Sequence, residues 1–245
     1  MRWIYFSPHL DDAILSCGGL IWEQTRAGTR VEVWTIWAGD LPNGPLSPFA
    51  EKLHATWQTG TEAPARRRDE DVKACHIVGA RHRHLSFPDC IYRRGMNGEW
   101  LYPNEEAIIG ELHPADRPLV ETLHDLLVAL IRVEDTLVCP LSIGGHVDHR
   151  LTRSAVEFLR MPLHYYADVP YVLKEPSSEA TLTSRMQARV LKVSTSGLEA
   201  WQAGVAAYGS QISSFWSSLD EMRQAIQNYG RGGIRIWSVG QTTAS

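Results

Sequence analysis

The hexapeptide SPHLDD, at residues 7–12, directly follows the apolar run WIYF, at residues 3–6. The apolar run predicts a short buried strand, and the hydrophobic spacing over 13–27 predicts a helix that ends at Gly28. One histidine and two aspartates of the hexapeptide therefore stand where a strand ends and a helix begins. In open α/β sheets this carboxyl edge is where ligands bind, so the hexapeptide is the first candidate for a functional site.

A second polar loop repeats this arrangement far along the chain. The segment GGHVDH, at residues 144–149, follows the short apolar run TLVC, at 136–139, and precedes a helix predicted over 150–159. Its two histidines, His146 and His149, can join the first loop only if the fold brings the two strand ends together. We predict that it does, and that the two loops form one site.

The stretch after the first helix sets the fold class. Residues 31–37, VEVWTIW, are β-branched and aromatic and predict a second strand. A strand, a helix and a strand in succession form a βαβ unit, which implies a parallel sheet with a right-handed crossover. No linker or internal repeat divides the chain, so residues 1–245 are predicted to form one α/β domain. Further strands are predicted at 82–87, 136–139, 164–171, 188–193 and 234–239, and further helices at 49–57, 65–78, 119–132, 150–159, 197–215 and 220–228.

The composition is that of an ordinary globular protein of 245 residues, with 44% hydrophobic and 21% charged residues. A net charge of -4 argues against a nucleic-acid partner. The 4 cysteines form no CxxC pair, which favours free thiols in a reducing compartment. No stretch reaches the roughly 18 uninterrupted apolar residues of a membrane span, and Asp11 and Asp12 interrupt any signal-peptide core. We therefore expect a cytoplasmic protein.

The residue types in the two loops are those of a mononuclear zinc centre. A catalytic zinc site takes three protein ligands, commonly histidine and a carboxylate, and keeps one position for water. His9 and Asp12 supply two ligands, and either His146 or His149 supplies the third. We choose His149, because it begins a helix much as Asp12 does and leaves His146 for catalysis.

The remaining side chains of the loops suit the hydrolysis of an amide. Bound zinc lowers the pKa of its water to about 7 and polarises a carbonyl. Asp11 is then the candidate general base, and His146 is the candidate electrophile for the developing oxyanion. Asp148 is expected to hold the imidazole of His146 in one tautomer.

Each motif also has a purely structural interpretation. A His-x-x-His pair at a helix start is a weak metal signal by itself, and an Asp-Asp pair after a strand is more often a helix cap. Two such loops, each after an apolar strand and together rich in histidine and aspartate, are much harder to explain by coincidence. Cys17 lies on the apolar side of the first helix without a base beside it, so we expect packing there rather than a thiol nucleophile.

Together these residues resemble a known family. The motif SPHLDD with CGG at 17–19, and the motif GHVDH at 145–149, are similar to the two signature motifs of the PIG-L/LmbE-like deacetylases. Members of that family are zinc-dependent enzymes that remove acetyl groups from N-acetylglucosamine-type substrates or cleave related amides. Weaker similarities lie at 67–70, 74–79, 87–89 and 208–211, so that the resemblance spans about residues 2 to 212.

The resemblance implies a fold and a set of roles. The implied fold is a Rossmann-like three-layer sandwich with a mostly parallel central sheet. The implied roles are zinc ligation by His9, Asp12 and His149, general-base catalysis by Asp11, oxyanion stabilisation by His146 paired with Asp148, and substrate binding by Arg67.

The sequence departs from the family at one position. Some members carry a tyrosine two residues before the first histidine of the second motif, where it helps to polarise the carbonyl. Gly144 stands at that position here. Either His146 and zinc suffice, or a residue from the long loops at 39–64 and 90–118 takes over that task.

The predicted function is zinc-dependent hydrolysis of an amide, foremost the N-deacetylation of an acetamido sugar or its conjugate. One alternative is an amidase that cleaves a thiol conjugate or another amide metabolite at the same site. A more distant alternative is a non-catalytic binding module for a sugar or nucleotide, which the lack of a GxGxxG after the first strand disfavours for dinucleotides. Trp57 and Trp100 are candidates to stack on a sugar ring, whereas Trp34 and Trp37 are expected in the core. The sequence leaves homo-oligomerisation open.

Overall fold

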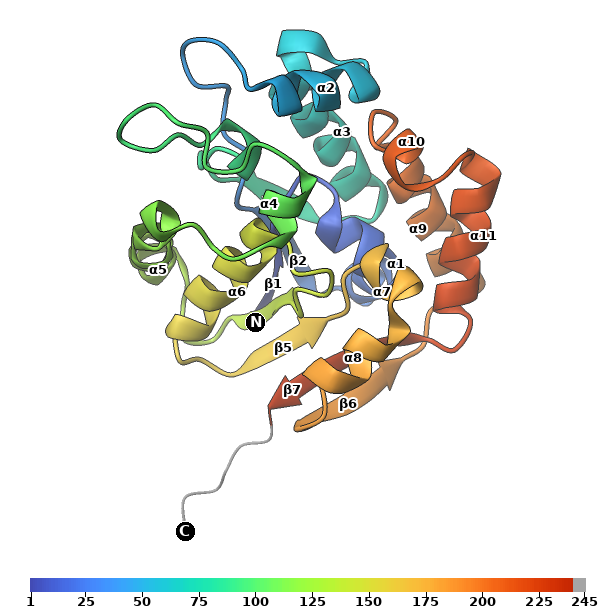
Figure 1. The fold of residues 1–245 in the computed structure, drawn as a ribbon. Coiled ribbons are helices and arrows are strands. Elements are labelled where there is room, and N and C mark those ends of the chain that lie inside the picture. The colour runs from blue at the N-terminus through green and yellow to red at the C-terminus, as the bar shows by residue number, and fades with distance from the viewer. Residues whose placement is uncertain (240–245) are drawn as a thin grey trace.

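Seven strands form one sheet at the centre of the molecule (Figure 1). The computed structural model describes residues 1–239, so the end of the predicted domain, 240–245, lies outside the described residues. The strands are β1 (Arg2–Ser7), β2 (Arg30–Thr35), β3 (Arg81–His84), β4 (Thr136–Pro140), β5 (Leu163–Tyr166), β6 (Met186–Leu191) and β7 (Ile234–Val239). Their order is β3-β2-β1-β4-β5-β7-β6. The first five run parallel, and β7 is antiparallel to both of its neighbours. The predicted α/β fold with a mostly parallel sheet is confirmed.

Helices cover both faces of this sheet. The longer ones are α1 (Asp12–Arg26), α2 (Pro48–Trp57), α3 (Ala63–Ile77), α5 (Pro118–Leu130), α6 (Val147–Phe158), α9 (Thr195–Ala206) and α11 (Leu219–Gly230), and the shorter ones are α4 (Glu105–Ile109), α7 (Tyr171–Lys174), α8 (Pro176–Leu182) and α10 (Ile212–Phe215). Helices α1, α3 and α11 pack around α9, and α5 packs against α6 on the other side of the sheet (Figure 1). In the part of the chain that the structure describes, no helix has the length and apolar character needed to cross a membrane.

The chain reverses its direction of travel across the sheet between β1 and β4. It moves outward from β1 to β2 and β3, and then returns to place β4 on the other side of β1. Trp3 pairs with Thr136 and Tyr5 with Val138, so the two strands lie side by side and point the same way. Such a switch point opens a crevice at the carboxyl ends of the strands. The loops after β1 and β4 are the two polar motifs.

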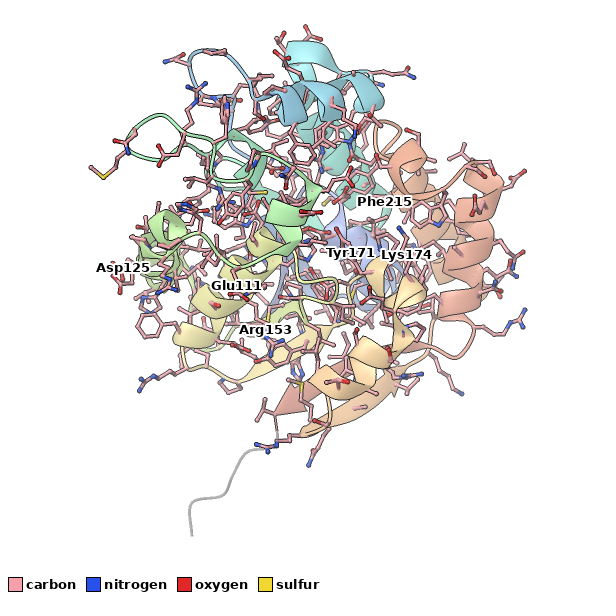
Figure 2. All side chains as sticks on the ribbon, in the orientation of Figure 1. Glu111, Asp125, Arg153, Tyr171, Lys174 and Phe215 are labelled. Atoms are coloured by element: carbon pink, nitrogen blue, oxygen red, sulfur yellow. The ribbon has the colours of Figure 1, made fainter. Side chains whose placement is uncertain are left out.

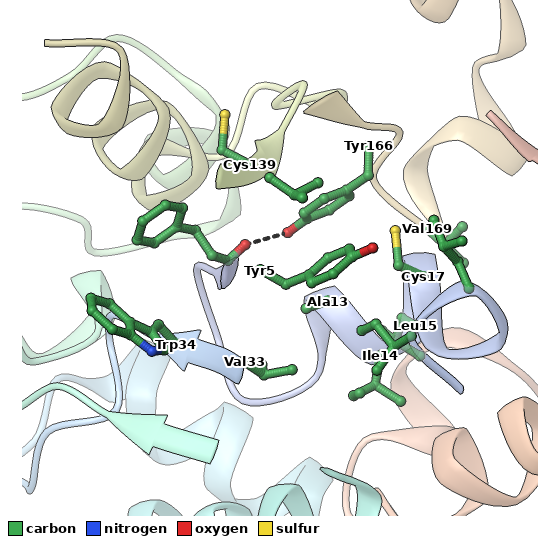
Figure 3. Packing of buried hydrophobic residues seen from close by; sticks show 14 of the residues in the cluster. Tyr5, Ala13, Ile14, Leu15, Cys17, Val33, Trp34, Cys139, Tyr166 and Val169 are labelled. Carbon is green, nitrogen blue, oxygen red and sulfur yellow. Dashed lines mark hydrogen bonds between the residues drawn. The ribbon is translucent and has the colours of Figure 1, made fainter. Parts of the chain in front are cut away.

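The central strands are almost wholly apolar because helices bury both of their faces. Trp34 and Trp37 lie in this core, as predicted. Figure 3 shows the hydroxyl of Tyr166 donating to the backbone carbonyl of Phe6 at 2.9 Å, which links β5 to β1 across the edge of β4. Cys17 is fully buried in the same cluster, where burial raises the pKa of its thiol. This burial agrees with the packing role predicted for Cys17.

Some predicted elements have different ends, and for two of them a local contact explains the difference. Strand β5 stops at Tyr166 rather than at residue 171, because Asp168 turns away from the sheet to accept a hydrogen bond from His149. The single helix predicted over 197–215 is two helices, α9 and α10. Between them Tyr208 donates to Asp71 at 2.6 Å, which holds the connection against α3 instead of letting it continue as a helix. The short helices α4, α7 and α8 lie in segments where no helix was predicted.

Helix α6 begins earlier than predicted, and this matters for the site. It starts at Val147 rather than at residue 150, with His146 as its N-terminal cap. The side chain of His146 accepts from the backbone N–H of Asp148 at 3.2 Å. His149 therefore lies in the first turn of a helix, not in a loop, and its direction is fixed by the helix.

Gly18 permits the close packing of α1 on α9. A Cβ at this position would overlap Cδ1 of Trp201 and lie 3.0 Å from its Nε1, and that indole donates to the carbonyl of Ile14 at 2.7 Å. We predict that Gly18→Ala lowers the free energy of unfolding by about 1–3 kcal/mol, the usual cost of overpacking. Urea unfolding measures this. Gly232→Ala is the control, because Gly232 has nothing within 4 Å of its added Cβ and should stay within about 0.5 kcal/mol of the wild type. Equal stability of Gly18→Ala and wild type would contradict the prediction.

Candidate active site

The two polar motifs meet at the carboxyl edge of β1 and β4. His9, Asp11 and Asp12 come from the β1–α1 loop and the first residue of α1, and His146 and His149 come from the cap and first turn of α6. The structure thus brings together all five of these predicted residues. Ring nitrogens of the three histidines lie within 4.8 Å of one another.

Asp12 stands between two imidazoles. Its Oδ2 lies 3.4 Å from Nδ1 of His9 and 3.3 Å from Nε2 of His149, and it also accepts from the backbone N–H of His9 at 2.7 Å. One carboxylate oxygen and two ring nitrogens therefore converge on a small volume. This is the convergence that the sequence predicts for the ligand set.

Each of these two imidazoles is held at its other nitrogen by a second carboxylate. Nδ1 of His149 lies 2.7 Å from Oδ1 of Asp168, and Nε2 of His9 lies 3.0 Å from Oδ2 of Asp148. Metal-binding histidines almost always carry such a partner, which sets the ring orientation and raises the basicity of the free nitrogen. The donor set and its supports fit a divalent metal ion.

The charges in this cluster are strongly coupled. Burial lowers the pKa of His149, but the carboxylates of Asp12 and Asp168 outweigh it and raise that pKa to about 9. Burial favours the neutral form of Asp12, yet its contacts with His149 and His9 hold its pKa well below the ordinary value. The pKa of His146 shifts in the opposite direction to that of His149: burial and the neighbouring His9 and His149 lower it well below the ordinary value. The ring of His146 is therefore neutral.

Asp11 is buried and does not act as a helix cap. It occupies the position before α1, but its side chain makes no capping hydrogen bond, which removes the structural interpretation of the Asp-Asp pair. Burial, and next the charge of Asp12, raise its pKa to about 6, although Arg67 and His9 act in the other direction. Its Oδ2 lies 3.4 Å from Nη2 of Arg67. A carboxylate with a pKa near neutrality is suited to proton transfer.

Asp148 acts differently from the prediction. Its carboxylate does not hydrogen-bond the ring of His146; instead it pairs with the guanidinium of Arg93, accepts from the backbone N–H of Cys90 at 3.0 Å and contacts His9. The backbone N–H of Asp148, not its carboxylate, bonds Nδ1 of His146. Because Nδ1 accepts this bond, the proton of the neutral ring resides on Nε2. Asp148 thus fixes the tautomer of His146 through its main chain and the ring of His9 through its side chain.

A cavity of about 170 Å³ opens above these residues. Its lining includes His9, Asp11, Asp12 and His146, together with side chains from distant parts of the chain, many of which are apolar. Figure 2 marks two residues of the lining, Tyr171 on α7 and Phe215 on α10. The complete lining is His9, Asp11, Asp12, Leu53, Trp57, Arg67, Asp89, Ile91, Ile108, His146, Tyr171, Gln211, Ser214 and Phe215.

Arg67 and Trp57 lie together in the cavity wall. The guanidinium of Arg67 sits 4.9 Å from the ring centroid of Trp57 and 3.9 Å from Oδ2 of Asp89, so it covers one face of the indole. Trp100 is not part of the lining: Arg94 lies 3.8 Å from its ring in a turn away from the site. Of the two tryptophans proposed for sugar stacking, the structure places only Trp57 at the cavity.

Several residues of the site were not found from the sequence. Asp168 follows an apolar strand, as Asp11 does, and that position was an available signal; it was assigned to the interior of a strand instead. Asp89 lies in the weak family similarity at 87–89, to which no role was given, and Tyr171 follows Pro170; neither has a partner at ligand spacing. Only the fold brings them to the cavity.

The hydrogen bond between Asp168 and His149 can be tested through the affinity for metal. We predict that Asp168→Ala weakens metal binding by about 10–100-fold, because His149 loses the partner that orients it. Competition with a chromophoric chelator measures the affinity. Asp125→Ala on the exposed surface of α5 (Figure 2) is the matched control and should bind as the wild type does. Equal affinity in both variants would show that His149 does not need Asp168.

Comparisons with known proteins identify similar deacetylases. A family model described as GlcNAc-PI de-N-acetylase matches residues 4–159. A 2'-N-acetylparomamine deacetylase of Streptomyces fradiae is 29% identical over 256 residues, which cover 99% of this chain and 83% of that protein. A protein of the same name from Niallia circulans is 31% identical over 188 residues, which cover 69% of this chain and 66% of that protein. A teicoplanin deacetylase solved in a zinc-inhibited form has a TM-score of 0.84 and 28% identity, with 100% of both chains covered.

Proposed function

Because this chain belongs to the GlcNAc-PI de-N-acetylase family, we propose that it is a zinc-dependent N-deacetylase of an acetylated amino sugar or of a conjugate that carries one. The resemblance to the PIG-L/LmbE-like deacetylases is confirmed, and the relatives are enzymes that hydrolyse amides. The observation that carries the proposal is the placement of Asp11. It is a buried carboxylate without a capping role, adjacent to a His–Asp–His set and open to a cavity.

The proposed zinc ligands are His9, Asp12 and His149. Two imidazoles and one carboxylate are a common ligand set of catalytic zinc, which leaves a position for water. The carboxylates of Asp168 and Asp148 on the outer nitrogens support this assignment. When bound, zinc supplies a water of lowered pKa and polarises the acetyl carbonyl.

The protein side chains carry the proton and charge steps. Asp11 takes a proton from the water whose oxygen attacks the acetyl carbon. The C–N bond then breaks as Asp11 returns that proton to the nitrogen, so that the products are acetate and a free amine. The Nε2–H of His146 is available to donate to the carbonyl oxygen as it gains negative charge. This assigns His146 the role expected from the sequence.

The size and lining of the cavity support a sugar-sized substrate group. A volume of about 170 Å³ is smaller than the roughly 300–1,000 Å³ of pockets for drug-sized ligands, so the cavity encloses about one ring and its acetamido group. The wall formed by Leu53, Trp57 and Phe215 is apolar and suits the carbon face of such a ring. Arg67 and Asp89 are then the proposed hydrogen-bonding partners of its hydroxyl groups.

An assay of acetate and amine release tests the proposal. The purified protein is given N-acetylglucosamine, 2'-N-acetylparomamine, an acetylated glycopeptide and an N-acyl thiol conjugate, with one equivalent of zinc per chain. We expect equimolar acetate and amine from at least one acetylated amino sugar, loss of turnover with a chelator and recovery on adding zinc back. Turnover of the thiol conjugate alone would establish the amidase alternative. No turnover of any amide would overturn the proposal.

We further propose the domain organisation of the protein, its compartment and the kind of partner that it binds. The enzyme is a single Rossmann-like domain, which the 3-2-1-4-5 order of β1 to β5 supports. It works in the cytoplasm, which its four free, buried cysteines support. Its partner is a small molecule and not nucleic acid, which the net charge of -4 supports.

A further inference from the structure

The hydroxyl of Tyr171 is a donor without a partner in the wall of the cavity. It makes no hydrogen bond to any residue within 1–239, whereas the buried hydroxyls of Tyr166 and Tyr208 are each bonded within the protein. The side chain of Tyr171 is half-buried and lines the cavity. The ring of Tyr171 stands edge-on to His149, with centroids 5.8 Å apart and an interplanar angle of 89°. The ring of Tyr171 therefore lies beside His149, one of the proposed ligands.

The same ring fills the space next to Gly144. A Cβ at this glycine would lie 2.5 Å from Cδ1 and 2.7 Å from Cγ of Tyr171, and the backbone φ of +85° disfavours any other residue there. Position 144 therefore carries no side chain because Tyr171 occupies the volume into which one would project. The aromatic group at this wall comes from α7 instead of from the loop before α6.

Asp168 holds both the start of α7, which carries Tyr171, and the side chain of His149. The carbonyl of Asp168 accepts from the backbone N–H of Val172 at 2.9 Å, which anchors the first turn of α7. The carboxylate of the same aspartate binds His149 and accepts from the N–H of Ile143 at 2.9 Å. One residue thus fixes His149, the loop that contains Gly144 and the start of α7. The position of the phenol is set by the same support as the proposed metal ligand.

We propose that the hydroxyl of Tyr171 donates a hydrogen bond to the acetyl oxygen as it becomes an oxyanion, and so shares this task with His146. The inference rests on the proposed function, since it names a second donor for the same reaction. No proton is transferred by Tyr171 and the bonds that form and break are those described above. A phenol that keeps its proton at neutral pH is a suitable donor for this purpose.

Removing the hydroxyl alone tests this role. We expect Tyr171→Phe to lower kcat by about 10²–10³-fold, the usual loss for one oxyanion donor, with KM within about threefold and with unchanged metal content and Tm. Tyr229→Phe is the matched control. Its hydroxyl also has no hydrogen-bond partner among the described residues, but its ring packs on Trp201 at 6.0 Å, away from the cavity lining. We expect wild-type kinetics from it.

A transition-state analogue separates oxyanion binding from a structural role. The probe is a methylphosphonamidate analogue of the acetylated amino sugar that the wild type turns over, since its tetrahedral P–O⁻ imitates the oxyanion. Tyr171→Phe should raise the Ki of this analogue by nearly the factor by which it lowers kcat/KM. Unchanged kcat, or a loss of kcat with undiminished affinity for the analogue, would overturn the role of Tyr171 while the deacetylase assignment stands. A wild type that deacetylates no acetylated sugar would overturn both.

Discussion

Asp11→Asn is expected to reduce deacetylation by about 10²–10⁴-fold, the contribution of a well-placed general base. The amide has nearly the same shape as the carboxylate and keeps an oxygen for Arg67, which lies 3.4 Å away. It cannot accept a proton from water at neutral pH. Because the capping role is absent, the substitution removes proton transfer and little else. Steady-state kinetics with the acetylated sugar measures the effect.

Two controls make the Asp11 result specific. Metal content and the thermal unfolding transition of Asp11→Asn should equal those of the wild type, since Asp12 and its two imidazole contacts remain. Asp69→Asn removes an exposed carboxylate of α3, two residues after Arg67, and should leave kcat unchanged. Retention of more than about a tenth of the wild-type rate by Asp11→Asn would assign the base to another residue.

The sequence predicts those residues of the site that directly follow the ends of β1 and β4. The loops after β1 and β4 carry their chemistry within a few residues of an apolar run, and parallel neighbours in a doubly wound sheet place their carboxyl ends together. For this reason the sequence could assign His9, Asp11, Asp12 and the two histidines of the second loop to one site. The choice of His149 over His146 as the ligand stays a prediction.

The rest of the site depends on contacts between remote segments, which no local pattern encodes. Asp168 reaches His149, and Tyr171 reaches the cavity, because β5 lies next to β4. Phe215 reaches the cavity because α10 lies near α2. Neither relation follows from hydrophobic spacing. At position 144 the sequence left two possibilities: either His146 and zinc suffice, or a residue from the long loops at 39–64 and 90–118 takes over the task of the missing side chain. The structure places Tyr171 there, from a different segment.

Asp148 shows how a correct residue can receive the wrong partner. Its place in the GHVDH motif, two residues after His146, suggested a pair of side chains. Once α6 begins at Val147, however, residue 148 lies in the first turn and offers its N–H to the cap. Its carboxylate is then free to bind Arg93 and His9. The start of the helix, which sequence patterns locate poorly, decides which atoms of Asp148 act.

His149→Ala is expected to remove the metal, from about one ion per chain to near none, and with it all measurable turnover. Asp12 then faces only His9, and the buried carboxylate of Asp168 loses its imidazole partner. Metal analysis of protein purified with zinc present measures the loss. His76→Ala, an exposed histidine on α3, should keep its metal.

The same measurement on His146→Ala decides between the two histidines of the second motif. Ring nitrogens of His146 and His149 both lie within 4.8 Å of His9, so distance alone does not rank them. Only His149 faces Asp12 and has a carboxylate on its outer nitrogen, whereas the Nδ1 of His146 is occupied by the N–H of Asp148 and its ring lines the cavity. We therefore expect His146→Ala to retain about one ion per chain while its turnover falls. Loss of metal from His146→Ala with retention by His149→Ala would exchange the two roles, and Asp168 would then support the catalytic imidazole instead of the ligand.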